Sequence, residues 1–188
     1  SPPLRCRPPG PSFRGSVSDQ ELKSFDDLPD DIQAGIRDLG WTAPMPVQAR
    51  VIPAMRGGGD LIVQARTGSG KTGAFGVPIA LAVDPERREP QALVMAPTRE
   101  LAGQVALEVE AMGRHRGIRT LAVYGGVAYG PQLEALRDGV HVIVGTPGRI
   151  LDHLGAGRLS FAAVRVVVFD EAAELLSLGF WPYMKEIR

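Results

Sequence analysis

Apolar residues gather in short runs that alternate with segments of helical spacing. The runs, rich in β-branched residues, occupy 61–64, 92–95, 120–123, 141–144 and 164–169. Helical patterns follow them at about 71–82, 98–112, 130–137, 147–155 and 173–178. The runs are almost wholly apolar, which is typical of strands covered on both faces. The pattern predicts an α/β domain with a parallel sheet flanked by helices on both faces.

Two short helices are predicted ahead of the first strand. The first spans 27–39, where apolar residues recur on one side, and Gly40 ends it. The second begins near Pro46 and runs through Gln48 to Met55.

Residues 1–22 are predicted to form a disordered tail. They are rich in proline and arginine, with glycine and serine, and they offer too little apolar surface to order themselves. The folded domain is therefore expected to span 23–188. Because the chain begins at Ser1 rather than Met, we expect it to be part of a longer protein.

The bulk composition is that of a folded domain without overall charge. Of 188 residues, 44% are hydrophobic, and 21 basic residues balance 21 acidic ones. Any nucleic-acid site must therefore come from local charge. Cys6 is the single cysteine, which excludes an internal disulfide and fits a cytoplasmic location. No apolar run approaches the roughly 18 residues of a membrane span, so we expect no membrane partner.

A glycine-rich loop between the first strand and its helix predicts a phosphate site. Such loops point several backbone N–H groups at one anion, and the helix adds the positive end of its dipole. The lysine can reach the outer phosphates, and the following hydroxyl can hold Mg²⁺. The alternative is a glycine-rich turn with an exposed lysine. The loop consists of Ala65, Arg66, Thr67, Gly68, Ser69, Gly70, Lys71 and Thr72.

A second nucleotide element follows the last apolar run. Asp170 and Glu171 come directly after Val164–Phe169. Asp170 could hold Mg²⁺, and Glu171 could orient and deprotonate an attacking water. Taken alone, the pair could equally cap the next helix. Together with the phosphate loop, the pair favours catalysis on a magnesium nucleotide.

These motifs and four others occur in the order typical of one family. The chain resembles the first RecA-like domain of a DEAD-box RNA helicase, of bacterial type, over roughly 23–188. Residues 65–72 resemble motif I and 170–173 motif II. Phe25 and Pro44-Met45-Pro46-Val47-Gln48 resemble the Q motif, Pro97-Thr98-Arg99-Glu100-Leu101-Ala102 motif Ia, Gly125-Gly126 the paired glycines, and Thr146-Pro147-Gly148-Arg149 motif Ib.

The resemblance implies roles for the upstream motif and for the loops after the strands. Gln48 would select adenine through its amide, with Phe25 stacking on the base; taken alone, they are a polar helix-start residue and a core residue. The resemblance also implies contacts to the RNA backbone without base readout. Taken alone, motif Ib is a helix start with proline at its first position. The RNA-binding residues so implied are Pro97, Thr98, Arg99, Gly125, Gly126, Thr146, Pro147, Gly148 and Arg149.

The chain departs from the family pattern in two ways. Ala173 stands where motif II has its last aspartate, so the coupling of ATP use to RNA release is in doubt. The motif III segment and the second RecA-like domain do not occur within the 188 residues. In folds of this type the motif III strand usually lies between the strands of motifs I and II. We therefore expect a gap in the sheet and no RNA unwinding by this chain alone.

The resulting hypothesis is the ATP-binding domain of an RNA-dependent ATPase that binds ATP, Mg²⁺ and RNA and needs a second RecA-like domain. One alternative is a non-catalytic, nucleotide-switched RNA-binding module, and another is a P-loop enzyme such as a small-molecule kinase. A basic cluster at 114–119 is either a further phosphate contact or solvated surface, and 84–90 is predicted to be a charged surface loop.

Overall fold

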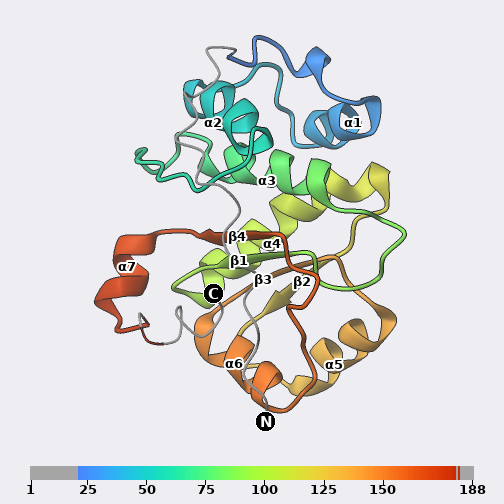
Figure 1. Ribbon diagram of the computed structural model, residues 1–188, viewed down its shortest axis with the longest axis vertical. Helices are drawn as coiled ribbons and strands as arrows, with labels where there is room; N and C mark the ends of the chain where they lie inside the picture. Colours follow the sequence, from blue (N-terminus) through green and yellow to red (C-terminus); the bar gives the residue numbers. More distant parts are fainter. Residues whose placement is uncertain (1–20, 181, 183–188) are drawn as a thin grey trace.

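The computed structural model describes residues 21–180 and residue 182 (Figure 1). The first twenty residues of the predicted tail lie outside this range. Residues 21 and 22, which the tail assignment included, contact the second helix: the Leu22 N–H donates to the Ala49 carbonyl at 2.8 Å, and Arg50 pairs with Glu21 at 2.9 Å. The ordered domain therefore starts earlier than residue 23.

Four parallel strands form the sheet, at four of the five positions that the sequence predicts. They are β1 (Ala92–Met95), β2 (Thr120–Val123), β3 (Val142–Gly145) and β4 (Val166–Phe169). The order across the sheet is β2-β3-β1-β4, with Ala92 opposite both Val142 and Val166. Strand β1 lies between β3 and β4, and all four of its residues are buried.

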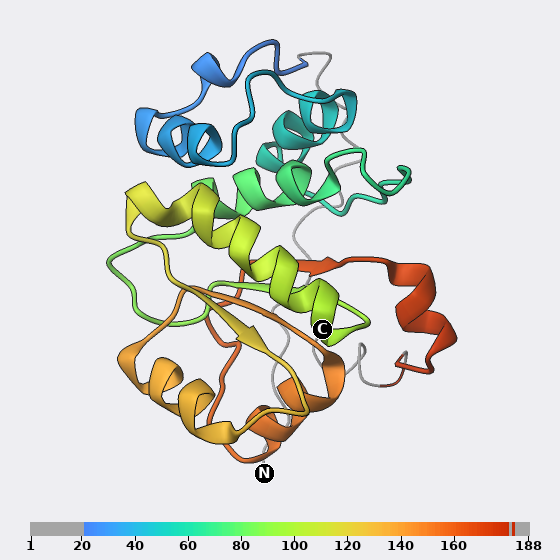
Figure 2. The ribbon, with the colours of Figure 1, turned by 180° about the vertical axis from the view of Figure 1, so that it is seen from behind.

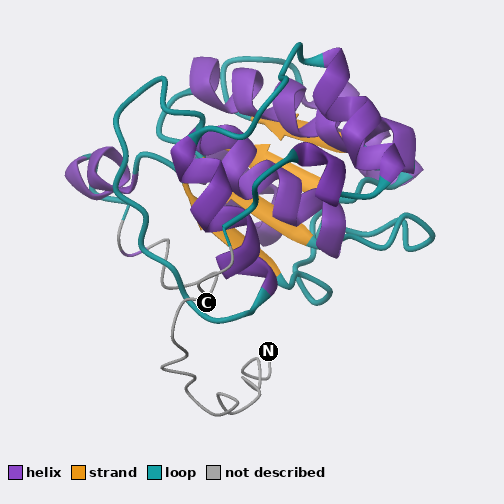
Figure 3. Cartoon of the chain, turned by 90° about the horizontal axis from the view of Figure 1, so that it is seen from above, coloured by secondary structure: helices purple, strands orange, loops and turns teal. Residues whose placement is uncertain are grey.

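Helices cover both faces of the sheet (Figures 1 and 3). On one face lie α3 and α4, with α1 and α2 packed outside them, and on the other lie α5 and α6; α7 projects beyond the end of β4 (Figures 1 and 2). The helices are α1 (Asp30–Asp38), α2 (Pro46–Arg56), α3 (Lys71–Ala82), α4 (Arg99–Gly113), α5 (Tyr129–Asp138), α6 (Pro147–Gly155) and α7 (Ala172–Ser177), with short 3-10 turns η1 (Phe25–Asp27) and η2 (Arg114–Arg116).

The core has two parts, one on each face of the sheet. Ala92 and Val94 join the larger cluster under α3 and α4, whereas Leu93 and Met95 join the smaller cluster with Ile150 of α6. This division follows from the two-residue period of a strand. It explains why the strand residues are almost all apolar.

The strand predicted at 61–64 is not formed. Leu61, Ile62 and Val63 are 40%, 102% and 42% exposed and lie outside the sheet. An apolar run becomes a strand only when a neighbouring strand takes up its backbone hydrogen bonds. Here β4 is the edge of the described sheet, and its Val167 is 40% exposed. The apolar run at 61–64 therefore has no neighbouring strand to pair with in the described sheet.

Two residues of the basic cluster at 114–119, His115 and Arg116, pair with α1. Arg116 bonds both carboxylate oxygens of Asp31, at 2.7 and 3.3 Å, and His115 lies 2.8 Å from Asp38. The pairing with Arg116 lowers the pKa of Asp31. These contacts hold η2 against α1. Arg114, His115 and Arg119 are exposed, which agrees with the interpretation of the cluster as solvated surface. Within the described range, no helix has the length and apolarity needed to cross a membrane.

Helices α1 and α4 meet backbone to backbone at Gly35. A Cβ atom on Gly35 would lie 2.4 Å from the Ala111 carbonyl oxygen and 2.6 Å from that of Met112. Neither carbonyl can move without disturbing α4, whose last turn is buried there. The contact therefore requires glycine.

We predict that Gly35→Ala lowers the free energy of unfolding by about 1–3 kcal/mol, the usual cost of forcing extra volume into a packed contact. Urea denaturation followed by circular dichroism measures it. Gly103→Ala on α4 is the matched control, because its new Cβ would meet only the Tyr124 ring at 3.9 Å. Equal stability of the two variants would contradict the predicted contact.

Candidate functional site

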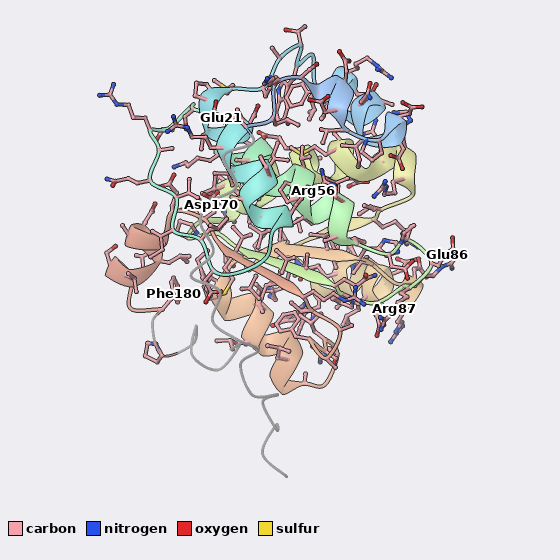
Figure 4. The ribbon with its side chains drawn as sticks, turned by 45° about the horizontal axis from the view of Figure 1, so that its top comes forward. Glu21, Arg56, Glu86, Arg87, Asp170 and Phe180 are labelled. Atoms are coloured by element: carbon pink, nitrogen blue, oxygen red, sulfur yellow. The ribbon has the colours of Figure 1, made fainter. Side chains whose placement is uncertain are left out.

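The loops that follow the strands all lie at one edge of the sheet. Because the strands are parallel, their carboxyl ends share that edge, where ligands bind in open α/β sheets. Asp170 lies there, at the end of β4, while Glu86 and Arg87 project from the opposite end of the sheet (Figure 4). Both Glu86 and Arg87 are exposed, which confirms the predicted charged surface loop.

The glycine-rich loop has the backbone of a phosphate cradle. Gly68 and Gly70 have φ angles of +78° and +87°, which glycine adopts without steric cost. The Ser69 N–H donates to the Arg66 carbonyl at 3.2 Å and closes a turn. The Ser69 Oγ is buried with no hydrogen-bond partner among the described residues. A buried hydroxyl without a partner is costly, and a phosphate oxygen would satisfy it.

Gln48 holds the end of this loop. Its Oε1 accepts the Met45 N–H at 2.9 Å, and its Nε2 donates to the Gly70 carbonyl at 3.2 Å. The amide is 2% exposed. A Cβ on Gly70 would lie 2.7 Å from the Gln48 Nε2, so this close approach also needs glycine. Gln48 therefore connects α2 directly to the start of α3.

The acid pair after β4 meets the lysine of the loop. The Lys71 Nζ lies 2.6 Å from the Glu171 Oε1, although the two residues are 100 positions apart. Glu171 has a φ angle of +48°, the only positive value for a non-glycine residue in the described part of the chain. This left-handed conformation costs roughly 1 kcal/mol or more, and such strain often occurs at functional sites. The turn directs Glu171 toward Lys71.

Asp170 is buried beside a second negative charge. Its side chain is 8% exposed, and its Oδ1 accepts the Glu171 N–H at 3.0 Å. Burial raises the pKa of Asp170, and the charge of Glu171 raises it further. Lys71 and the hydrogen bond from Glu171 lower the pKa of Asp170 by less. A bound cation would favour the charged carboxylate.

The described residues contain no group of three or more His, Cys, Asp or Glu side chains that could form a metal cage. Mg²⁺ does not need one, because it keeps several waters and uses one or two protein oxygens together with substrate phosphates. Thr72, in the first turn of α3, and Asp170 are the groups whose chemistry fits such an ion.

Phe25, one of the two predicted adenine contacts, lines a cavity. The same cavity is lined by Trp41, an aromatic residue that the sequence analysis did not single out. Phe25 is 5% exposed and lines a cavity of about 240 Å³ together with Trp41 and Arg37. A Cβ on Gly73 would lie 2.5 Å from Gln48 and 2.6 Å from the Trp41 ring. Trp41 thus lies between the cavity and the loop. Trp41 comes directly after Gly40 and seven residues before Gln48, and this closeness to the Q motif could have marked it as a candidate base contact.

Several residues of the predicted RNA-binding set share an exposed surface. Thr98, Arg99, Gly126 and Gly148 are exposed. The Arg99 Nη1 would lie 3.1 Å from a Cβ on Gly126, so the motif Ia arginine lies against the paired glycines. The Thr98 hydroxyl is already used, because it accepts the Leu101 N–H at 3.2 Å and caps α4.

Other members of that set are buried. Pro97, Pro147 and Arg149 are buried, and Gly125 and Thr146 are half-buried. Pro147 is the first residue of α6, as the interpretation of motif Ib as a helix start requires. Thr146 makes no side-chain cap, so its hydroxyl does not serve the helix.

Ala173 lies on the exposed face of α7, in its first turn. An aspartate at this position would point away from the folded core.

The chain matches one family model and many curated proteins. The model described as "DEAD/DEAH box helicase" matches residues 45–188. The ATP-dependent RNA helicase DeaD of Haemophilus influenzae is 48% identical over 160 residues, covering 84% of this chain and 26% of that protein. DeaD of Escherichia coli K12 is 49% identical over 150 residues (79% and 24%). The DEAD-box ATP-dependent RNA helicase CshA of Bacillus cereus is 45% identical over 153 residues (81% and 29%).

Solved structures share the fold. A DEAD box protein from the hyperthermophile Methanococcus jannaschii has a TM-score of 0.82 at 39% identity, covering 89% of this chain and 46% of that one. A hypothetical ATP-dependent RNA helicase from Sulfolobus tokodaii has a TM-score of 0.77 at 35% identity (85% and 46%). The chain spans about a quarter of the curated relatives and just under half of the solved chains.

We predict that Asp170→Asn raises the melting temperature at neutral pH by a few degrees. The raised pKa of Asp170 means that the folded chain binds this proton more tightly than the unfolded chain does. The charged carboxylate therefore destabilises the fold above its raised pKa, and this penalty disappears as the pH falls toward the ordinary value of 3.8.

Thermal unfolding in metal-free buffer at a series of pH values measures this effect. The gain from the substitution should shrink on acidification. Asp60→Asn, at an exposed position, is the matched control and should leave the melting temperature unchanged. A loss of stability in Asp170→Asn at neutral pH would contradict the assigned cost of burial.

Proposed function

Since the chain belongs to the DEAD/DEAH box helicase family, we propose that it is the first RecA-like, ATP-binding domain of an RNA-dependent ATPase that separates RNA strands. The observation that carries the proposal is the contact of Lys71 with Glu171 at 2.6 Å. It brings the phosphate loop and the acid pair to one place, as hydrolysis of a magnesium nucleotide requires.

The phosphates of ATP would lie in the loop formed by residues 65–72. Backbone N–H groups of this loop, the Ser69 hydroxyl and the start of α3 supply donors, and Lys71 supplies the charge. Lys71 now pairs with Glu171, so phosphate binding would exchange one anionic partner for another. The release would free Glu171 to orient and deprotonate water.

Mg²⁺ is the cofactor whose chemistry these groups fit. Thr72 and Asp170 would hold the ion, Asp170 through a bound water or directly. When bound, the ion neutralises charge that develops on the phosphates. It would also relieve the cost of keeping Asp170 charged in a buried position.

The base of the nucleotide is proposed to be adenine. Gln48 keeps one amide hydrogen and one lone pair beyond its bonds to Met45 and Gly70, which is the complement of adenine's exposed edge. Trp41 and Phe25 line the nearby cavity and offer aromatic surface. Trp41 is the better stacking partner, because part of it is accessible to a ligand, whereas Phe25 is buried and only 5% exposed.

RNA is the proposed polymer substrate, bound through its backbone. Arg99 and the exposed glycines of the strand-end loops form a surface that a phosphate chain can approach closely. A second RecA-like domain of the same protein would complete the cleft. Pairing of β4 with a further strand would also cover the open edge of the sheet. Such a protein would work in the cytoplasm.

A second candidate function is a nucleotide-switched RNA-binding module without turnover. Ala173 favours it, because this exposed position lacks the acid through which the family couples the two sites. Hydrolysis assays on the intact protein distinguish the two candidates.

We predict that Glu171→Gln in the intact protein lowers RNA-stimulated phosphate release by at least about 100-fold, the usual contribution of a general base. Binding of a fluorescent ADP analogue should be equal or tighter, because Lys71 is no longer held by a carboxylate. Glu86→Gln, at the opposite end of the sheet, is the matched control and should behave like the unsubstituted protein. Undiminished phosphate release by Glu171→Gln would exclude the assigned role.

We predict that ATP displaces the same fluorescent ADP analogue at a concentration about tenfold lower than GTP does. An adenine site leaves buried groups unpaired when guanine binds, and each tenfold step corresponds to about 1.4 kcal/mol. Titration of both nucleotides against the bound analogue measures this. Equal displacement by ATP and GTP would contradict the adenine assignment and favour a P-loop enzyme of another kind.

A further inference from the structure

Arg149 belongs to the predicted RNA-binding set, yet its guanidinium is turned into the protein. The residue is 8% exposed. Its Nη2 donates to the Val127 carbonyl at 3.1 Å, and its Nη1 donates to the Gln132 Oε1 at 3.4 Å. Its guanidinium carbon lies 3.9 Å from the centre of the Tyr129 ring. Two of its five N–H donors are used and one face lies against Tyr129, and because the residue is buried, little of the guanidinium is accessible to a phosphate.

Gln132, near the start of α5, is the centre of this arrangement. It is 4% exposed. Its Nε2 donates to the Tyr124 carbonyl at 3.1 Å, and its Oε1 accepts from Arg149 and, at 3.0 Å, from His153. Burial, and then the charges of Arg149 and Arg158, lower the pKa of His153, so a neutral ring donates through its Nε2–H.

These bonds join two loops that lie far apart in the sequence. The loop 124–128 carries the paired glycines, and its carbonyls are held at Tyr124 by Gln132 and at Val127 by Arg149. Arg149 and His153 belong to α6, whose first turn is motif Ib. The Tyr129 hydroxyl adds a bond to Asp152 at 3.0 Å. Both candidate RNA loops are thereby fixed to one buried polar network.

The loop 124–128 turns between the Tyr124 and Val127 carbonyls. Gly126 has a φ angle of +79°, and it lies against Arg99. Holding the carbonyls at Tyr124 and Val127 fixes the direction of the backbone between them, and with it the N–H groups available to an anion. Free loops of this kind sample many conformations, and ordering them on binding weakens affinity.

We infer that Gln132 and Arg149 are positioning residues that hold the loop 124–128 in the conformation that meets the RNA backbone, and that Arg149 is not itself a phosphate ligand. This inference rests on the proposed function for its RNA partner. It assigns the direct charge contact to Arg99, which is exposed beside Gly126. The Arg99 Nε pairs with the exposed Glu100 at 2.7 Å, a surface ion pair that a phosphate can replace at little cost.

Hydrogen exchange tests the positioning step without RNA. In Gln132→Leu the amides of 124–128 should exchange roughly tenfold faster, since about 1.4 kcal/mol of local stabilisation is lost. The amides of β1 should be unchanged. Gln104→Leu is the matched control, because Gln104 is exposed on α4 and donates to Glu108 at 3.1 Å. Unchanged exchange at 124–128 in folded Gln132→Leu would overturn the inference.

RNA affinity tests the role of Arg149. For a labelled single-stranded oligouridylate and the intact protein, Arg149→Lys and Arg149→Met should each weaken binding by about tenfold, because lysine cannot bond Val127 and Gln132 together. Affinity for the fluorescent ADP analogue should be retained. Arg149→Lys with the affinity of the unsubstituted protein would show that charge alone suffices and would overturn the inference.

The salt dependence separates a positioning residue from a phosphate ligand. Removing a direct contact to single-stranded RNA lowers the slope of log affinity against log salt by about 0.7. We expect this change in Arg99→Met and an unchanged slope in Arg149→Met. An equal fall in both would overturn the inference. No RNA binding by the unsubstituted protein would instead exclude the proposed function, and hydrogen exchange would still decide whether the loop is held.

Discussion

The structure depends on the parallel pairing of its four strands around β1. Because β1 is buried on both faces and pairs with β3 and β4, the ends of these strands stand side by side. The register sets Met95 opposite Gly145 and Phe169, so the loops after all three strands begin at the same level. Residues far apart in the sequence therefore meet at one edge. Asp170, Glu171 and the candidate RNA-binding residues follow strands of this sheet, whereas Lys71 begins α3 after a run that is not paired in it.

The proposed nucleotide end of this edge is built at a cost in stability. Asp170 is a carboxylate in a buried place beside the charge of Glu171, and Glu171 has a left-handed backbone. The Ser69 hydroxyl is buried without a partner among the described residues. In the proposed function, a magnesium nucleotide would offset the buried charge of Asp170 and give the Ser69 hydroxyl a partner. The fold would then hold in advance an arrangement that the ligand stabilises, which is the physical content of preorganisation.

At the proposed RNA-binding end of this edge, the buried polar groups are held by hydrogen bonds within the protein. Charge lies at the surface on Arg99, which pairs with the exposed Glu100, while Arg149 and Gln132 are joined in a buried hydrogen-bond network. In our inference, the two arginines that the family resemblance assigns to RNA binding take different roles. Their difference lies in burial and partners, which decide whether a guanidinium is free to meet a phosphate.

The sequence by itself determined the class of fold and most of its elements. Strands at 92–95 and 120–123 and helices at 71–82 and 147–155 were predicted with the bounds that the structure shows, because apolar runs, glycines and prolines specify them locally. The phosphate loop and the acid pair were also evident, since each is a short motif directly after an apolar run. The run before the phosphate loop does not pair in the described sheet, so the contact of Lys71 with Glu171 comes from the tertiary structure.

Only the tertiary structure decided the rest. The run at 61–64 has the composition of a strand but no neighbour to take its hydrogen bonds, so it lies exposed. The burial of Arg149 depends on Gln132 and Val127, and the place of Trp41 depends on Gly73, which packs against it from another helix. The neighbouring residues in the sequence set a residue's preference for helix, strand or turn. Its contact partners come from distant segments that folding brings alongside it. These partners decide whether an apolar run becomes a strand or a loop, and whether a polar side chain binds a ligand or supports another residue.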